Sequence, residues 1–340
     1  MKFYKSIFNN DYRKRVKHQI GQFANKAVLK KLPPVYRYWT QKYLVPKIVE
    51  VFGVRSIIHV YRDAFAGALK SQGDGGKILS IGSGDGIIEV AIANELIKSG
   101  VTNFTILVTE LSDIRLERAK DLVKEKSLED YFQFKLVDIN EWDPQEKFVG
   151  VMAQHTLHHI VELEKTFDFI DDNLSTEGVF VIVDMIGRNG HMRWPETLDI
   201  VEKIWNFMPE KVKFNHQFNK EVPDYINWDC SNKGFEGIRS QDILPLLCEK
   251  FSMSHFLGVG GFIDIFVERG YGHNFDVDDK SDTDLIDIMS ILNDSLLETG
   301  AIKPTMIFAV ARKKDPEIKT IIYKGLTPEA AIRRAPETPA

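Results

Sequence analysis

Three histidines stand within five residues of the stretch MAQHTLHHIVEL, at positions His155, His158 and His159. The chain holds only nine histidines, so this cluster is a candidate for chemistry. His155 and His159 have the i, i+4 spacing of a helical metal pair, but no HExxH pattern is present. Asp184 and His191 could serve as distant ligands, yet nothing in the sequence singles them out. We therefore expect no metal, and we favour a catalytic loop, because histidine can accept a proton near neutral pH.

A glycine-rich loop, ILSIGSGDG at residues 78–86, is the second candidate site. Its glycines allow a tight turn and let a ligand approach the main chain closely. A dinucleotide fingerprint would read GxGxxG with an acid about 20 residues further on. Here Ile87 breaks that spacing, and the acid Glu110 stands 28 residues beyond Gly82. A P-loop is excluded, because no GKS or GKT follows.

Two carboxylates follow this loop, each at the end of an apolar run. Glu110 ends the run FTILVTE, where a carboxylate can hold a ribose diol. Asp138 ends the run FQFKLVD, where it can read an adenine amino group. Ligands of open α/β sheets bind beyond the carboxyl ends of the strands, so the loop, the two acids and the histidines should share one crevice.

The elements that must position these residues alternate along the chain. Apolar runs predict strands, and Ser112 is placed as the N-cap of a helix. Strict alternation implies a parallel sheet with helices on both faces. The expected strands are 77–81, 104–111, 132–139, 148–154, 177–187, 251–259 and 305–314, and the expected helices are 86–100, 112–127, 161–174 and 282–300.

This ordered set resembles the class I S-adenosylmethionine-dependent methyltransferases over about residues 77–187, with a looser match through the final strands. The resemblance implies an α/β, Rossmann-like fold with a doubly wound, mostly parallel, seven-stranded sheet, and S-adenosylmethionine as the cofactor. Within it, Glu110 would bind the ribose and Asp138 with Ile139 would flank the adenine. Gln154 would lie near the sulfonium. The cofactor-binding residues that it implies are Gly82, Ser83, Gly84, Gly86, Glu110, Leu111, Asp138, Ile139 and Gln154.

Two positions depart from that family pattern. Ser80 stands where the family usually has an acid, two residues before the first loop glycine. Val149 stands where an Asp often opens the fourth strand. Neither change touches the ribose acid, but the first affects the hold on the amino group of the cofactor.

The histidine loop resembles that of small-molecule O-methyltransferases, in which a base histidine precedes Asp-Trp. His158 matches that base, while His159 and Ile160 replace the Asp-Trp, so the partner of the base is not identified. A non-catalytic alternative is that these histidines pack under the cofactor or cap a helix. His159 and His191 are further candidates for catalysis, and the residues expected to hold the substrate are Arg188, Arg193 and Trp194.

Composition and charge limit the remaining choices. The chain has 340 residues, 44% of them hydrophobic and 27% charged, which suits a globular protein. No apolar run can span a bilayer, no secretory signal is evident, and the two cysteines have no zinc spacing. A cytoplasmic location is therefore expected. Five parts are expected: an N-terminal helical cap (1–70), a cofactor-binding core (71–187), an aromatic, partly helical substrate-binding insertion (188–250), the remaining strands with an inserted helix (251–314) and a tail (315–340).

The charge is unevenly distributed. Residues 1–70 hold 15 Lys+Arg and 3 Asp+Glu, a balance of +12, whereas the rest of the chain carries −17. The basic segment is expected to pack on the acidic body, within the chain or across a homodimer. A nucleic-acid partner is not expected, although an RNA or protein methyltransferase that docks through this segment is an alternative.

The combined prediction is methyl transfer to a small-molecule acceptor at a hydroxyl of a sugar or glycoconjugate, with a histidine general base. The alternatives are an N-methyltransferase and a non-catalytic cofactor-binding protein. The sequence does not name the acceptor.

Overall fold

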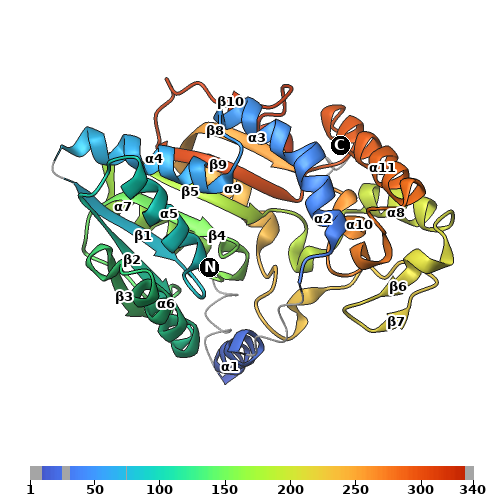
Figure 1. Ribbon diagram of the computed structural model, residues 1–340, viewed down its shortest axis with the longest axis horizontal. Coiled ribbons are helices and arrows are strands. Elements are labelled where there is room, and N and C mark those ends of the chain that lie inside the picture. Colours follow the sequence, from blue (N-terminus) through green and yellow to red (C-terminus); the bar gives the residue numbers. More distant parts are fainter. Residues whose placement is uncertain (1–9, 25–30, 74, 334–340) are drawn as a thin grey trace, which may run out of the picture.

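The computed structural model describes residues 10–24, 31–73 and 75–333. At its centre lies an eight-stranded sheet in the order β10-β8-β9-β5-β4-β1-β2-β3 (Figure 1). A separate two-stranded ribbon is formed by β6 and β7. The strands are β1 (Gly76–Ile81), β2 (Phe104–Glu110), β3 (Phe132–Leu136), β4 (Phe148–Gln154), β5 (Leu174–Met185), β6 (Phe214–Asn215), β7 (Lys220–Glu221), β8 (Phe251–Val259), β9 (Met306–Lys313) and β10 (Ile321–Ile322).

The doubly wound, mostly parallel sheet expected from the sequence is confirmed. All neighbouring strands in this sheet pair in parallel, except that β9 runs antiparallel to both β5 and β8. The sheet has one strand more than expected, because β10 pairs with the edge strand β8. This two-residue pairing lies in the tail and is too short to leave a pattern in the sequence.

Two hydrophobic layers cover the two faces of the sheet. Tyr61 and Phe65 of α4 share one layer with alternate strand residues such as Ile78. Phe167 of α7 and Leu244 of α9 share the other layer with the intervening strand residues, which face the opposite side of the sheet. The helices are α1 (Asn10–Ala24), α2 (Pro34–Trp39), α3 (Val45–Phe52), α4 (Ile57–Gln72), α5 (Ile87–Lys98), α6 (Asp113–Glu125), α7 (Leu163–Asn173), α8 (Pro195–Trp205), α9 (Ser240–Lys250), α10 (Ile263–Val267), α11 (Lys280–Glu298) and α12 (Pro328–Ala331).

Part of the basic N-terminal region pairs with acids of the same chain. Lys42 lies in the π-helical turn η2 (Thr40–Leu44), and its Nζ is 2.6 Å from Asp287 of α11. Lys47 of α3 makes an ion pair of the same length with Asp294 of α11. The expectation that this region packs on the acidic body is thus met within the chain at these two lysines.

A second, smaller lobe contains α8, α10 and α11, to the right in Figure 1. Trp205 of α8 is fully buried there, and its ring meets those of Tyr225, Phe266 and Tyr271. This lobe therefore combines part of the predicted insertion with the segment between β8 and β9. The last helix of the predicted insertion, α9, packs instead on the sheet with α7 and β8.

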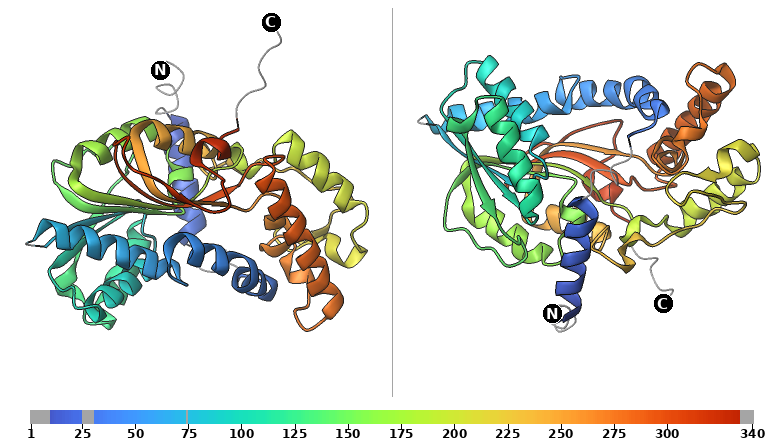
Figure 2. Two further views of the ribbon diagram at one scale, coloured as in Figure 1. Left: turned by 90° about the horizontal axis from the view of Figure 1, so that it is seen from above. Right: turned by 60° about the horizontal axis from the view of Figure 1, so that its bottom comes forward.

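The helix α1 stands apart from α2, α3 and α4 in Figure 1 and in the right view of Figure 2. It lies at the end of the sheet where the loops after β2 and β3 emerge, and it is held there by Tyr12, whose hydroxyl donates to Asp138. Within the described ranges, no helix combines the length and the apolar character needed to cross a bilayer.

Candidate active site

A cavity of about 730 Å³ lies at the carboxyl ends of β1, β2 and β4. The structure brings together in its lining most of the residues predicted for the cofactor and for catalysis. Gly84 and Gly86 belong to the same loop but do not face the cavity. The predicted residues that line it are Gly82, Ser83, Glu110, Leu111, Asp138, Ile139, Gln154, His158, His159 and His191.

The three glycines of the loop all adopt positive φ angles, between +63° and +73°. A side chain at Gly84 would collide with the guanidinium of Arg115, and one at Gly82 would collide with Thr156. The left-handed backbone and these close neighbours explain why glycine occupies the turn. At Gly82, which lines the cavity, the loop thus presents main chain and no side-chain bulk.

Glu110 ties the glycine loop to the end of β2. One carboxylate oxygen accepts a hydrogen bond of 2.8 Å from the Gly84 amide, and the other accepts from the amides of Leu111 and Ser112. The carboxylate is buried and lines the cavity. Its position is therefore fixed before any ligand arrives.

Ser83 offers an independent test of whether this end of the cavity fits a polar ligand. Its hydroxyl oxygen is buried and has no hydrogen-bond partner among the described residues. A buried hydroxyl without a partner is unfavourable, so the arrangement suits a ligand that supplies one. The glycine turn, this hydroxyl and the fixed carboxylate together fit the polar groups of a nucleoside that carries an amino acid.

Asp138 is held from three directions. Its carboxylate accepts from the hydroxyl of Tyr12, 2.6 Å away, and from the side-chain and backbone amides of Asn140. The ring of Tyr12 also packs against Phe235 at 5.2 Å between centroids. The helix α1 therefore forms part of the cavity wall on the Asp138 side.

Beneath the glycine loop, a buried acid accompanies Ser80. The Ser80 hydroxyl donates to the carboxylate of Glu89 on α5, at 2.6 Å. Burial raises the pKa of Glu89 to about 7. An acid is thus present near the place where the family usually has one, but it comes from the helix and not from the strand.

At the end of β4, Gln154 is oriented by Tyr61. The hydroxyl of this fully buried tyrosine donates to the side-chain carbonyl of Gln154 at 2.8 Å. The Gln154 side chain is therefore held where β4 opens into the cavity.

His158 has the partner that the sequence did not identify. Its Nδ1 lies 2.5 Å from a carboxylate oxygen of Asp184, and both side chains are buried. Asp184 also accepts from the backbone amides of Thr156 and Leu157, so it fixes the turn η4 (Leu157–His159) as well as the imidazole. With Nδ1 hydrogen-bonded to Asp184, Nε2 of His158 is the ring atom directed at the other histidines and Glu236.

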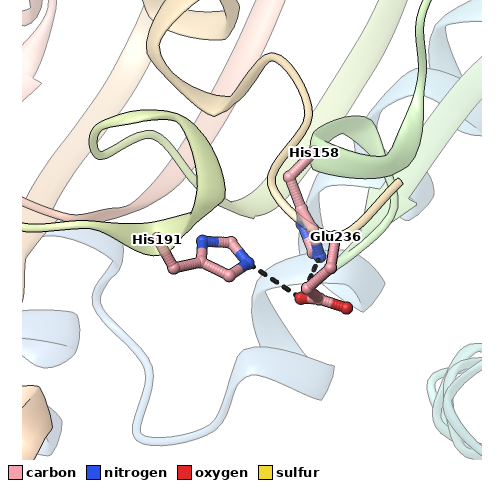
Figure 3. A group of neighbouring side chains, drawn as sticks. All are labelled: His158, His191 and Glu236. Carbon is pink, nitrogen blue, oxygen red and sulfur yellow. Dashed lines mark hydrogen bonds and ion pairs between the residues drawn. The ribbon is translucent and has the colours of Figure 1, made fainter. Parts of the chain in front are cut away.

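Glu236 joins three histidines at one point of the cavity wall, and two of them, His158 and His191, are drawn with it in Figure 3. Its carboxylate is 2.8 Å from Nε2 of His191, 3.4 Å from Nε2 of His158 and 3.8 Å from Nε2 of His159. In Figure 3, His191 and His158 point from separate loops toward the same carboxylate. Four side chains from three distant segments thus form one cluster, here called the histidine cluster: His158, His159, His191 and Glu236.

The charges in this cluster shift its pKa values in opposite directions. Burial disfavours the charged imidazole of His158, but the charges and hydrogen bonds of Asp184 and Glu236 outweigh it and raise the pKa of His158. Burial, together with the neighbouring charge of His158, lowers the pKa of His159. Burial would raise the pKa of Glu236, but its hydrogen bonds to His158 and His191 hold it well below its usual range.

Backbone hydrogen bonds tie the three loops of the cluster to one another. The Gly190 amide donates to the carbonyl of Gly237, and the Ile238 amide donates to the carbonyl of His158. Arg239 adds a bidentate pair with Glu164 of α7. The cluster is therefore mounted on a rigid frame, although its members are far apart in the sequence.

The three residues expected to hold the substrate lie elsewhere. Arg193 is buried beside Asp264, with 3.8 Å between the charged groups, and does not line the cavity. The ring of Trp194 packs between the guanidinium groups of Arg188 and Arg333. The chain turns sharply at Gly190 and His191, which both have positive φ, so of this stretch only His191 faces the cavity.

Sequence reasoning named Asp184 only as a possible distant metal ligand and not as the partner of His158, and it missed Glu236 and Tyr12 as members of the site. Asp184 did carry a signal, since it is the single charged residue in the buried run VFVIVDM. Glu236 and Tyr12 carried none, because each lies in a polar stretch and reaches the cavity only through the folded arrangement.

The sequence matches the family described as "Methyltransferase domain" over residues 54–239, which is more than half of the chain. The chain therefore belongs to this family and is an S-adenosylmethionine-dependent methyltransferase of class I, as the resemblance implied. No curated protein matches it.

Solved structures that resemble this fold include other methyltransferases. One is the N-methyltransferase NodS from Bradyrhizobium japonicum WM9 with S-adenosyl-L-homocysteine, at 11% identity and a TM-score of 0.42, covering 88% of this chain and 100% of that one. A putative sarcosine dimethylglycine methyltransferase from Galdieria sulphuraria has 14% identity and a TM-score of 0.44, covering 83% and 98%. The StiE O-methyltransferase segment 961–1257 has 11% identity and a TM-score of 0.40, covering 70% and 68%.

Proposed function

We propose that this enzyme transfers the methyl group of S-adenosylmethionine to a hydroxyl of a small-molecule acceptor, at the wall formed by the histidine cluster. The observation that carries the proposal is the buried pair of His158 and Asp184, which opens into the same cavity as the glycine loop. An imidazole oriented by a carboxylate is the arrangement that general-base catalysis requires.

The glycine-loop side of the cavity would hold the cofactor. Glu110 would accept hydrogen bonds from the ribose hydroxyls, since its carboxylate lines the cavity and retains free lone pairs beside its backbone bonds. Ser83 would meet the methionine part of the cofactor, and Asp138 with Ile139 would flank the adenine. When bound, S-adenosylmethionine supplies an electrophilic methyl group on its sulfonium.

The opposite wall would activate the acceptor. The raised pKa of His158 favours its protonated form, so the imidazole must first lose its Nε2 proton before it can act as a base. In its neutral form, His158 would donate Nδ1–H to Asp184 and take the proton of the acceptor hydroxyl at Nε2. The hydroxyl oxygen would then be ready to take the methyl group that the bound cofactor supplies, with the electron pair of the carbon–sulfur bond left on sulfur. Because His158 and Gln154 line one cavity, the two reactants can be held in line, which supplies much of the rate enhancement.

The acceptor is proposed to be a sugar or glycoconjugate by the sequence resemblance alone, and a cytoplasmic location belongs to the same proposal. A panel of monosaccharides, glycoconjugates and small amines, incubated with isotope-labelled S-adenosylmethionine, tests the acceptor class. We expect a product whose labelled methyl group sits on oxygen by mass spectrometry and NMR. A labelled methyl group found only on nitrogen would contradict the O-methyl assignment.

A further inference from the structure

We propose that His158, His191 and Glu236 bind one divalent transition-metal cation. Each of the three residues offers one ligand atom, and these atoms lie within 4.8 Å of one another. Figure 3 shows the two imidazoles and the carboxylate converging from separate loops. The sequence alone led to the opposite expectation, because it gave no sign that Glu236 stands between the histidines.

The distances suit a shared cation. Nε2 of His191 lies 2.8 Å from a Glu236 oxygen, and Nε2 of His158 lies 3.4 Å from the same oxygen. Ligands about 2.1 Å from a common cation, at angles between tetrahedral and octahedral, stand roughly 3.0–3.4 Å apart. The remaining pair, the two Nε2 atoms, lies within 4.8 Å, so the two imidazoles need to move closer together to place all three ligand atoms around one ion.

Asp184 makes the hydrogen bond to the non-ligating ring nitrogen of His158 that metal sites usually have. A ligating histidine usually donates its other ring N–H to a carboxylate, which orients the ring and strengthens it as a ligand. The Nδ1 atom of His158 makes this contact with the buried Asp184. Asp184 is itself held by the amides of Thr156 and Leu157, so the orientation of His158 is fixed.

The loop that carries His191 is held in place at some conformational cost. His191 has φ of +56°, a left-handed conformation that residues other than glycine rarely adopt. The hydrogen bond from Gly190 to the Gly237 carbonyl secures this turn beside Glu236. Strained residues that the surrounding structure holds firmly are concentrated at functional sites.

Two imidazoles and one carboxylate define the class of ion. This set leaves coordination positions open and suits Zn²⁺, Fe²⁺, Co²⁺ or Mn²⁺, whereas Mg²⁺ and Ca²⁺ prefer ligand sets of oxygen alone. Because the cluster lines the cavity, an open position would face the acceptor. The role of this ion in catalysis rests on the proposed function. The cation would coordinate the acceptor hydroxyl and make it easier to deprotonate. It would thus replace the proton acceptance proposed above for His158.

Calorimetric titration of the full-length, chelator-treated protein with ZnCl₂, without cofactor or acceptor, tests the binding. We expect one Zn²⁺ per chain and no heat with MgCl₂. Glu236→Gln and His191→Ala should each weaken Zn²⁺ binding by more than about 100-fold, and Asp184→Asn by roughly 10- to 100-fold. CoCl₂ should give visible absorption bands that disappear in Glu236→Gln.

His59→Ala is the matched control, because His59 forms a histidine–glutamate pair with Glu95 at 3.3 Å near the surface, and no group of three ligands includes it among the described residues. It should bind Zn²⁺ like the unmodified protein. Circular dichroism checks that each variant is folded. Absence of Zn²⁺ binding, or equal affinity in Glu236→Gln and His59→Ala, would overturn the inference.

The proposed function is judged separately, by product formation. A chain that binds Zn²⁺ but methylates no acceptor would count against the function and leave the metal site standing. Full methyl transfer by protein from which the chelator has removed all metal would exclude a catalytic role for the ion while leaving the function intact.

Discussion

The two walls of the cavity are built in different ways. The glycine-loop wall comes from consecutive strand ends, where Glu110 follows β2 and Asp138 follows β3. The histidine wall comes from three loops, with His158 after β4, His191 after β5 and Glu236 just before α9. The first wall is contiguous and regular, whereas the second exists only after the second lobe and α9 have folded onto the sheet.

The two walls also differ in charge. The first places backbone amides, a serine hydroxyl and fixed carboxylates at the cavity. The second concentrates three histidines around Glu236, with the buried Asp184 behind them. This difference suggests a division of work: one wall binds a polar cofactor and the other changes the protonation of an acceptor.

The largest expected loss, a loss of turnover, comes from a substitution in the histidine wall. His158→Asn keeps a donor near the Nδ1 position for Asp184 but removes Nε2, so the buried carboxylate retains a partner. Turnover should fall by roughly 10²- to 10⁴-fold, because a positioned base contributes about that much. Binding of S-adenosylhomocysteine, measured by calorimetry, should stay within a few-fold. A variant with normal turnover would show that His158 is not required for activation.

The next effect belongs to the glycine-loop wall. Glu110→Gln removes a charge that would accept hydrogen bonds from the cofactor, and such bonds contribute about 1.5–3 kcal/mol. S-adenosylhomocysteine should therefore bind roughly 10- to 100-fold more weakly by calorimetry. Glu117→Gln, on the exposed side of α6, is the control and should bind normally. Equal affinity in the two variants would remove Glu110 from the cofactor site.

A smaller effect tests whether α1 belongs to the cofactor wall. Tyr12→Phe removes the hydroxyl that donates to Asp138 and keeps the ring that packs on Phe235. Losing a hydrogen bond of about 1 kcal/mol should weaken cofactor binding by roughly fivefold. Tyr38→Phe removes a similar tyrosine–aspartate bond, to Asp287 outside the cavity, and should have no effect on that affinity. If both variants bind equally well, α1 does not contribute.

The smallest effect concerns stability beneath the glycine loop. Because burial raises the pKa of Glu89 to about 7, the fold favours its protonated form. The resulting stabilisation is complete below the unfolded pKa, near 4.5, and is lost as the pH rises through about 7. Thermal unfolding from pH 5 to pH 8.5 should show this decline.

Glu89→Gln should flatten this pH dependence, since glutamine does not titrate. Glu95→Gln, at a half-buried position of the same helix, should retain it. The difference should reach at most roughly 3 kcal/mol at high pH. Parallel curves for Glu89→Gln and the unmodified protein would mean that Glu89 is ionised in the fold throughout this range.

The sequence predicted one wall better than the other, for physical reasons. The glycine loop, Glu110 and Asp138 sit at the ends of apolar runs, and the parallel arrangement of those runs dictates that their ends meet. Glu236 has no such constraint, because its position depends on how the second lobe folds back. Arg193 and Trp194 show the converse: the sequence places them soon after β5, but the turn at Gly190 and His191 directs them away from the lining of this cavity.

A crystal structure with bound S-adenosylhomocysteine would show directly whether the two walls divide the work in this way. We expect Glu110 to contact the ribose hydroxyls, and the sulfur to face Gln154 and the histidine cluster across the remaining space. A complex in which Glu110 lies away from the ribose, or in which the sulfur points away from His158, would contradict this assignment of the two walls.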